Sequence, residues 1–230
     1  MNDHYYTRTP SSASRPAECT FSYRGEELVF QTDAGVFSRG EVDTGTRLLL
    51  EALPETLQGE ILDLGCGWGV IGISIAKKWP GTRVTMADVN TRALDLSREN
   101  AKRNCAEVVC VESDGMAAFA GRRFDAIVTN PPIRAGKQVI YKMFSDAAAA
   151  LTEGGALYLV IRKQQGAESC IRFLETIYAE VEKLDRSGGF WVLRACAPQA
   201  HKKVIKVPCG ALVTAVYGMI TGLSDDHFTG

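Results

Sequence analysis

The chain alternates short, mostly apolar runs with stretches of helical periodicity. Buried strands are predicted from the apolar runs at 61–64, 84–87, 108–111, 124–129 and 156–161. Elsewhere apolar residues recur every three or four positions, which predicts helices over 70–79, 91–104, 139–151 and 167–181. Strands that alternate with helices are typical of a doubly wound α/β protein, whose mostly parallel sheet is covered on both faces.

Antiparallel hairpins are predicted at both ends of this pattern. Near the start, alternating apolar residues flank a turn at Gly25, which indicates a β-hairpin over about 19–30. Near the end, strands at about 181–184 and 190–196 are joined by a glycine-containing turn over 186–189. With the five parallel strands, the closing hairpin predicts a sheet of seven strands.

The order of these elements predicts a single domain over residues 19–197. Residues 1–18 show no apolar periodicity and are interpreted as an irregular arm. Residues 198–230 fall outside the pattern and form a tail of unknown role. An uncharged apolar run at 210–223 lies within this tail, but it is too short to cross a membrane.

A glycine-rich loop follows the first parallel strand. Its glycines over 67–72 match the dinucleotide-binding fingerprint, and Asp63 precedes them. A second acid, Asp88, closes the next strand, so both carboxylates are expected at the carboxyl edge of the sheet. One carboxylate could face an ammonium group and the other a ribose diol. A dinucleotide site, or a glycine-rich turn without a ligand, stays an alternative at this point.

The loop and the two acids resemble the class I S-adenosylmethionine-dependent methyltransferases. Their first motif is similar to Asp-x-Gly-x-Gly-x-Gly, which matches Asp63 and the glycines over 65–69 here. Their second strand ends in an acid, which matches Asp88. The resemblance implies a Rossmann-like methyltransferase sheet of seven strands with a C-terminal antiparallel hairpin and a short N-terminal β-hairpin as an extension. It also implies S-adenosyl-L-methionine as the cofactor.

The segment before the first parallel strand adds to this resemblance. Phe37-Ser38, followed by Asp43-x-Gly45-Thr46 and a leucine-rich helix over 47–53, looks like the entry to the methyltransferase small domain family. That family includes ribosomal RNA guanine-N2 methyltransferases, and its entry loop lies over the cofactor site. The alternative is that Phe37 is a core residue and Asp43 a simple helix cap.

The resemblance also implies which residues bind the cofactor. After the third strand, an acid beside a glycine, Asp114-Gly115, can accept the adenine amino group. We expect the complete cofactor-binding set to be Phe37, Asp63, Gly65, Cys66, Gly67, Gly69, Asp88, Val89, Ser113, Asp114, Gly115 and Asn130.

The fourth strand ends in the catalytic candidates Asn130, Pro131 and Pro132. The Asn130 side-chain oxygen and the Pro131 carbonyl can each accept one hydrogen from a planar amino group, which points the nitrogen lone pair at the methyl carbon. Such alignment can supply most of the catalysis without a strong base. The alternative is a structural Asn-Pro turn that precedes a helix.

The residue after this motif bears on the substrate. In the family the motif marks methylation of an amino group of adenine, guanine or glutamine, and adenine and glutamine enzymes usually carry an aromatic residue where this chain has Ile133. Ile133 therefore favours the guanine-N2 branch, with ribosomal RNA or the small ribosomal subunit as partner. The predicted substrate-binding residues are Ile133, Arg134 and Lys137. Further cations that could neutralise phosphate are Arg122, Arg123, Lys77 and Lys78.

Composition limits the possible functions. The 230-residue chain has a net charge of -1, whereas RNA-binding domains are usually strongly basic, so nucleic-acid contact would need a local patch. Seven scattered cysteines without a Cys-x-x-Cys pair predict reduced thiols in a cytoplasmic protein. The three histidines, His4, His201 and His227, lie outside the motifs, so neither a metal site nor a histidine base is expected. No membrane association is expected, and the oligomeric state stays open.

Three other functions were weighed. A cysteine-nucleophile pyrimidine methyltransferase is disfavoured, because Pro208-Cys209 lies outside the fold pattern. A protein or small-molecule N-methyltransferase and a non-catalytic cofactor-binding module stay open as alternatives. The sequence thus favours an S-adenosylmethionine-dependent N-methyltransferase.

Overall fold

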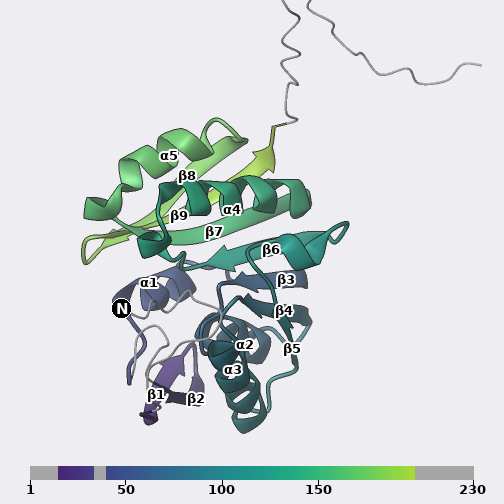
Figure 1. Cartoon of the computed structure of the whole chain (residues 1–230), viewed down its shortest axis with the longest axis vertical. Helices are drawn as coiled ribbons and strands as arrows, with labels where there is room; N and C mark the ends of the chain where they lie inside the picture. The colour runs from purple at the N-terminus through teal and green to yellow at the C-terminus, as the bar shows by residue number, and fades with distance from the viewer. Residues whose placement is uncertain (1–14, 34–39, 200–230) are drawn as a thin grey trace, which may run out of the picture. The chain divides into compact units, whose positions relative to one another are not determined.

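The computed structural model describes residues 15–33 and 40–199 (Figure 1). The predicted arm up to residue 14, Phe37 and the tail from residue 200 lie outside the described residues. The strands are β1 (Ala17–Tyr23), β2 (Glu26–Thr32), β3 (Gly59–Leu64), β4 (Thr82–Asp88), β5 (Val108–Glu112), β6 (Phe124–Thr129), β7 (Leu151–Arg162), β8 (Tyr178–Ser187) and β9 (Phe190–Pro198). The α-helices are α1 (Thr44–Glu51), α2 (Val70–Lys78), α3 (Thr91–Arg103), α4 (Lys137–Ala150) and α5 (Ala167–Leu174). Short 3₁₀ turns lie at η1 (Ala117–Phe119), η2 (Ile133–Ala135) and η3 (Lys163–Gln165).

Seven strands form one sheet in the order β5-β4-β3-β6-β7-β9-β8. The first five of these are parallel to one another, and β9 pairs antiparallel with both β7 and β8. The predicted seven-stranded, mostly parallel sheet with a C-terminal hairpin is therefore confirmed. Because the order reverses at β3 and β6, the chain leaves these two strands toward opposite sides of the sheet and opens a crevice at their carboxyl ends.

Helices cover both faces of the sheet. Alternate residues of β3 supply the two cores: Ile61 packs with residues of α1, α2 and α3, whereas Leu62 and Leu64 pack with residues of α4 and α5. All three side chains are at most 2% exposed. None of the helices in the described part of the chain is long and apolar enough to span a membrane.

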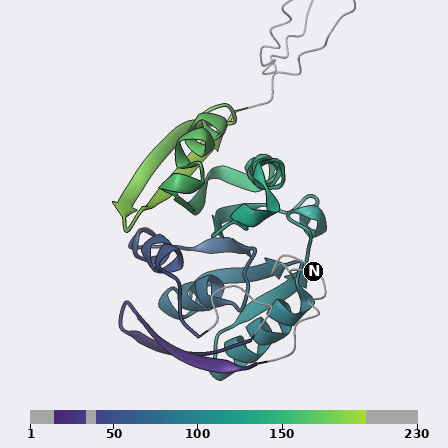
Figure 2. The same ribbon diagram turned by 60° about the vertical axis from the view of Figure 1, so that its left-hand side comes forward.

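The N-terminal hairpin of β1 and β2 is a separate two-stranded sheet, as predicted. Arg24 and Gly25 form its turn with φ values of 45° and 92°, the left-handed backbone that a two-residue hairpin turn requires. Figure 2 shows the hairpin outside the helical layer, across the side formed by α2 and α3.

Two element boundaries differ from the predictions. The fifth parallel strand, expected over 156–161 after a turn at Gly154-Gly155, is β7 and begins at Leu151, so both glycines lie inside it, and a Cβ on Gly155 would come 2.9 Å from the Phe124 carbonyl oxygen. Gly155 therefore serves close strand approach rather than a turn. The helix expected to run to residue 181 ends at Leu174, and Tyr178 begins β8. Buried positions spaced three or four apart do not distinguish a helix from a turn followed by a strand over so short a stretch.

Candidate active site

A cavity of about 870 Å³ opens at the carboxyl ends of the parallel strands. The loops after β3, β4, β5 and β6 bring most of the predicted site residues to its wall. Those that line it are Gly65, Cys66, Gly67, Asp88, Val89, Ser113, Asp114, Gly115, Asn130, Pro131, Pro132, Ile133 and Arg134. The glycine loop and the Asn130-Pro131-Pro132 motif therefore line the same cavity.

Other predicted residues do not line this cavity. Asp63 lies in β3 before the glycine loop, Gly69 ends that loop as the N-cap of α2, and Lys137 begins α4. Phe37 lies outside the described residues. Whether these residues contact a ligand stays a prediction.

The four additional cations do not gather around the cavity. Lys78 ends α2 just before β4 and donates from Nζ to the Arg24 carbonyl at 3.0 Å. Arg122 precedes β6 and reaches Glu60 at the start of β3, with a nitrogen–oxygen distance of 3.3 Å. These positions, with their neighbours Lys77 and Arg123, lie at the amino-terminal edge of the parallel strands, opposite the cavity. They therefore do not share the cavity wall with Arg134, and whether they contact phosphate stays a prediction.

The glycine loop is held to the neighbouring strand by its backbone. The N–H groups of Gly65 and Cys66 both donate to the Ala87 carbonyl, at 2.8 and 2.9 Å. Gly69 then begins α2 with φ 93°, and a Cβ there would lie 3.0 Å from the Ile73 side chain. At Gly72 a Cβ would come 2.5 Å from the Met86 side chain, so this glycine permits close packing of helix on strand.

Asp63 is the most perturbed carboxylate of the site. It is 0% exposed; its Oδ2 accepts the Gly72 N–H at 2.8 Å, and its Oδ1 accepts no hydrogen bond within the described part of the chain. Burial raises the pKa of Asp63 to about 7, the Gly72 hydrogen bond lowers it, and the nearby Asp88 carboxylate raises it. Its carboxyl group therefore changes charge near neutral pH behind the loop rather than in the cavity.

Asp88 lies at the end of β4 and borders the cavity directly. Its Oδ2 accepts the Gly67 N–H and its Oδ1 the Asn90 N–H, both at 2.8 Å. Burial raises the pKa of Asp88, and these backbone hydrogen bonds oppose that rise. Each carboxylate oxygen keeps acceptor capacity for a further donor such as a hydroxyl group.

The loop after β5 has a fixed turn geometry. The Ser113 hydroxyl donates to the Gly115 carbonyl at 2.8 Å and accepts the Ala118 N–H at 3.1 Å. Gly115 adopts φ 55°, a conformation that favours glycine. The exposed Asp114 stands between these two residues on the cavity wall.

The Asn130 side chain is oriented by two residues of the α1 entry segment. Its Nδ2 donates to the Thr46 hydroxyl at 3.0 Å and lies 3.4 Å from each carboxylate oxygen of Asp43. Asp43 also caps α1, accepting the Gly45 N–H at 3.0 Å. Among the described residues Asn130 Oδ1 accepts no hydrogen bond, so the amide presents its oxygen as a free acceptor at the cavity.

Asp43 and Thr46 were not among the predicted site residues. The signal for them was the spacing Asp43-x-Gly45-Thr46, which reads equally well as a helix cap. The same carboxylate does both: it caps α1 and holds Asn130, which comes 87 positions later in the chain. A contact between such distant positions cannot be read from local pattern.

The cavity wall opposite the loops after β3, β4 and β5 comes from the end of β7 and the start of β9. Phe190 borders the cavity there, and a Cβ on Gly45 would lie 2.9 Å from its ring, so this glycine makes room for the aromatic side chain. The Arg162 guanidinium lies 4.7 Å from the Phe190 ring centre and also lines the cavity. No motif marks these two residues, because antiparallel pairing of β7 with β9 brings them together.

Metal ligands are not grouped in the described part of the chain. Over residues 15–33 and 40–199 no cluster of three or more histidine, cysteine, aspartate or glutamate side chains could hold a metal ion. The three histidines all fall outside those ranges.

The strand order, the glycine loop and the Asn130 motif at one edge of the sheet define a Rossmann-like methyltransferase. The chain belongs to the methyltransferase small domain family, whose model matches residues 27–194. The family predicted from the sequence is therefore confirmed.

Individual relatives agree with this assignment. The chain is 41% identical over 198 residues to the Bacillus subtilis (strain 168) protein named "Uncharacterized protein YbxB", a match that covers 85% of this chain and 98% of that protein. It is 37% identical over 139 residues to ribosomal RNA small subunit methyltransferase C of Haemophilus influenzae (strain ATCC 51907 / DSM 11121 / KW20 / Rd), covering 59% of this chain and 42% of that enzyme.

A solved structure supports the same fold. The T. thermophilus 16S ribosomal RNA N2 methyltransferase, in complex with AdoMet and guanosine, superposes with a TM-score of 0.73 at 30% identity. The match covers 82% of this chain and 52% of that enzyme. This chain thus spans about half the length of the two ribosomal RNA methyltransferases that it matches.

Proposed function

We propose that the protein is an S-adenosylmethionine-dependent methyltransferase that acts on an exocyclic amino group, the guanine N2 of ribosomal RNA. The observation that carries this proposal is the orientation of Asn130. Because Thr46 and Asp43 engage the amide nitrogen, the amide oxygen is left to accept a hydrogen from a substrate amine.

The residues around the glycine loop suit S-adenosylmethionine. Asp88 offers acceptor oxygens for a ribose diol, and Asp114, one loop further along the sheet edge, offers acceptor oxygens for the adenine amino group. The loop 65–69 supplies backbone groups for the methionine part. The buried Asp63 would attract the positive charges of S-adenosylmethionine through its own negative charge, and it would support the glycine loop. When bound, the cofactor supplies an electrophilic methyl group on a sulfonium.

The protein's part in the reaction is alignment. Asn130 Oδ1 and the Pro131 carbonyl each accept one hydrogen of the planar amino group, which directs the nitrogen lone pair toward the methyl group. Proline has no N–H, so the backbone there offers no competing donor. A general base is unnecessary for the transfer itself, because the amine becomes acidic as the new bond forms.

The substrate assignment rests on the wall of the cavity and on the relatives. Ile133 leaves the position after the motif non-aromatic, and the T. thermophilus enzyme holds guanosine. Arg134 and Arg162 line the same cavity and can meet RNA phosphates or a flanking base. Ribosomal RNA within the small ribosomal subunit is the partner we propose.

We also propose the cytoplasm as the compartment. The described residues contain six cysteines, Cys19, Cys66, Cys105, Cys110, Cys170 and Cys196, and all six are free thiols. Cys209 lies outside the described residues. Reduced thiols without disulfides are typical of a reducing compartment.

Isotope labelling tests this function in vitro. The purified protein is incubated with methyl-labelled S-adenosylmethionine and small ribosomal subunits from cells that lack it, and the RNA is digested to nucleosides. The proposal expects label in N2-methylguanosine and far less with Asn130→Ala. Label in methylated adenosine, in ribosomal protein or in a small molecule would contradict the substrate assignment.

A further inference from the structure

One face of α3 and its C-cap carries three polar side chains, Ser97, Asn100 and the C-cap residue Asn104, spaced three and four residues apart. Ser97 and Asn100 are both 0% exposed. Burying a hydroxyl or an amide is costly unless its hydrogen-bonding groups find partners. The partners of these side chains therefore show what this face holds in place.

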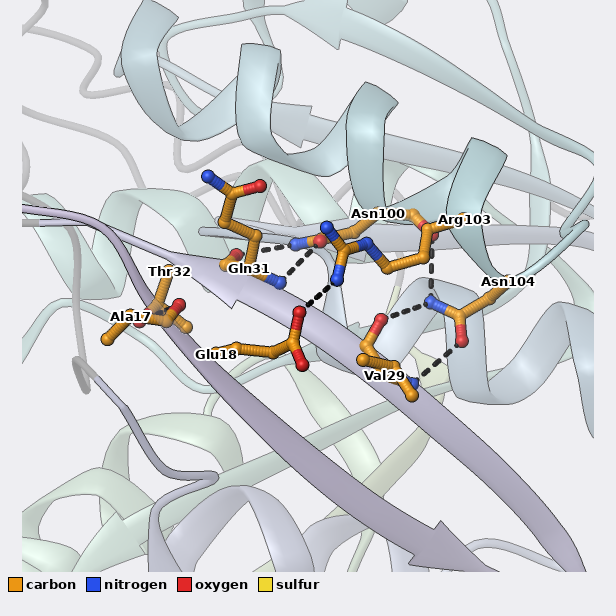
Figure 3. Close-up of polar contacts among 8 residues, drawn as sticks. All are labelled: Ala17, Glu18, Val29, Gln31, Thr32, Asn100, Arg103 and Asn104. Carbon is orange, nitrogen blue, oxygen red and sulfur yellow. Dashed lines mark hydrogen bonds and ion pairs between the residues drawn. The ribbon is translucent and has the colours of Figure 1, made fainter.

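Two of the side chains hold the N-terminal hairpin (Figure 3). Asn104 accepts the Val29 N–H and donates to the Val29 carbonyl, both at 2.9 Å. Asn100 accepts the Gln31 N–H at 2.7 Å and donates to the Gln31 carbonyl at 2.9 Å. Each amide thus satisfies both backbone groups of one residue on the edge of β2, as a neighbouring strand would.

The same face holds the glycine loop. Asn100 Nδ2 donates a second hydrogen bond to the Trp68 carbonyl at 2.9 Å, and the Ser97 hydroxyl donates to the Gly67 carbonyl at 2.7 Å. Gly67 and Trp68 both line the cavity. The hairpin adds an apolar contact, since the Phe30 ring lies edge-on to the Trp68 ring with centres 5.2 Å apart.

Asn100 therefore contacts both the hairpin and the glycine loop with one amide group. The Gln31 N–H requires the amide oxygen, so the hairpin fixes which end of the side chain is oxygen and which is nitrogen. With that orientation set, the amide nitrogen can hold the Trp68 carbonyl. Asn104 has the same contacts with the hairpin but none with the loop.

We propose that Asn100 is a positioning residue for the cofactor site, through which the docked hairpin holds the glycine loop in its binding conformation. This role rests on the proposed function, because it requires that the loop binds S-adenosylmethionine. Gly67 and Gly69 have φ values of 55° and 93°, so the loop is built from residues with large backbone freedom. Fixing two consecutive carbonyls removes that freedom before the cofactor arrives, which strengthens binding.

The coupling is reciprocal. If the docked hairpin strengthens cofactor binding, the bound cofactor strengthens hairpin docking by the same factor. The Gln31 N–H is hydrogen-bonded in this contact and reports on it through hydrogen exchange. Ligand binding is therefore expected to slow exchange of that amide, although Gln31 does not line the cavity.

Three alanine variants separate the contacts. Asn100→Ala removes the bonds to both hairpin and loop. Ser97→Ala removes only contacts with the loop, those to the Gly67 carbonyl and to Cys66 Sγ, and Asn104→Ala removes only bonds to the hairpin and its own helix. Affinity for S-adenosylhomocysteine is measured by isothermal titration, and thermal stability alongside it. We expect Asn100→Ala and Ser97→Ala to raise the Kd by about fivefold or more. Asn104→Ala should lower the Tm and raise the Kd less than Asn100→Ala does, because it weakens hairpin docking but leaves the loop carbonyls held.

The outcomes separate this role from the proposed function. If the parent protein binds no S-adenosylhomocysteine, the proposed function fails and the role of Asn100 falls with it. If the parent binds, and Asn100→Ala loses stability with unchanged affinity, Asn100 is purely structural. Ligand-slowed exchange at Gln31 that is lost in Asn100→Ala supports the coupling, and equal slowing in both proteins overturns it.

A second contact keeps the test decisive if Asn100→Ala does not fold. Phe30→Leu removes the aromatic edge contact with Trp68 while leaving the side-chain groups of α3 that form its hydrogen bonds unchanged. Together with Ser97→Ala it is expected to weaken ligand binding. Unchanged affinity in both of these folded variants would overturn the coupling.

Discussion

A pair of substitutions that exchanges the amide of Asn130 with the carboxylate of Asp43 tests how the catalytic amide is held. Asn130→Asp replaces the amide nitrogen with an oxygen that lies 3.4 Å from each carboxylate oxygen of Asp43. Two unit charges at that distance repel by about 5 kcal/mol at an effective dielectric constant of about 20. Both positions are half-buried rather than sealed, so we expect about 1–3 kcal/mol to be observed after solvent screening.

The double variant restores the polarity of the pair. Adding Asp43→Asn places a donor opposite the new carboxylate, and asparagine is as good a helix cap as aspartate, so α1 keeps its start. We expect Asn130→Asp to lower the free energy of unfolding by about 1–3 kcal/mol and the double variant to recover most of that loss. Methyl transfer should fall by on the order of a hundredfold in the single variant, because the amine is no longer aligned as in the parent.

The measurements are urea unfolding and single-turnover methyl transfer with saturating cofactor. Asp43→Asn alone is the control, since its amide oxygen can keep the cap on Gly45 while the charge behind Asn130 and the second acceptor oxygen, which accepts from the Thr46 hydroxyl, are lost. The reasoning fails if Asn130→Asp is as stable and as active as the parent. It also fails if the double variant is no more stable than Asn130→Asp, because the two side chains would then not interact.

Three further predictions concern the acids and the tail. Asp88→Ala should weaken S-adenosylhomocysteine binding by about 1.5–3 kcal/mol through loss of charge-assisted hydrogen bonds, and unchanged affinity in titration calorimetry would reassign the ribose contact. The pKa of Asp63 is raised by folding, so the native state holds the proton more tightly and stability from this group is lost as pH rises toward about 7. Asp63→Asn should therefore gain Tm relative to the parent as the pH rises from about 4 to about 7, the interval between the ordinary pKa of 3.8 and the folded-state pKa, and a pH-independent difference would refute the titration. Truncation after Gln199, whose N–H donates to the Ile177 carbonyl at 2.9 Å, should leave a folded, cofactor-binding protein, and insoluble product would place the tail in the core or in an interface.

The fold could be predicted because its signals are local. Each strand of the parallel sheet is a short apolar run, and caps such as Asn90 mark the helix starts, so the periodicity of the chain specifies the element order. The wrong element boundary occurs where the same buried positions fit both a helical and a strand spacing. Over 174–178 buried positions fit a helix, but backbone pairing of Tyr178 with Pro198 makes β8 begin there.

The site could be predicted only in part, for a similar reason. Asp88 and Asn130 end buried strands, and the carboxyl ends of parallel strands meet at one edge, so their convergence follows from the fold class. Burial of Asp63 behind the loop depends on its direction from β3, which the motif does not specify. Thr46, Phe190 and Asn100 act through contacts between distant elements, and no local pattern marks such contacts.

The most direct test of the central claim is nucleoside analysis of ribosomal RNA from cells that lack the protein. We predict that one N2-methylguanosine of the small-subunit RNA is lost and that the parent gene restores it. The gene for Asn130→Ala, at equal protein level, should not restore it, because that variant lacks the amide that orients the amine. Unchanged N2-methylguanosine, or full restoration by Asn130→Ala, would contradict a guanine-N2 methyltransferase that depends on this residue.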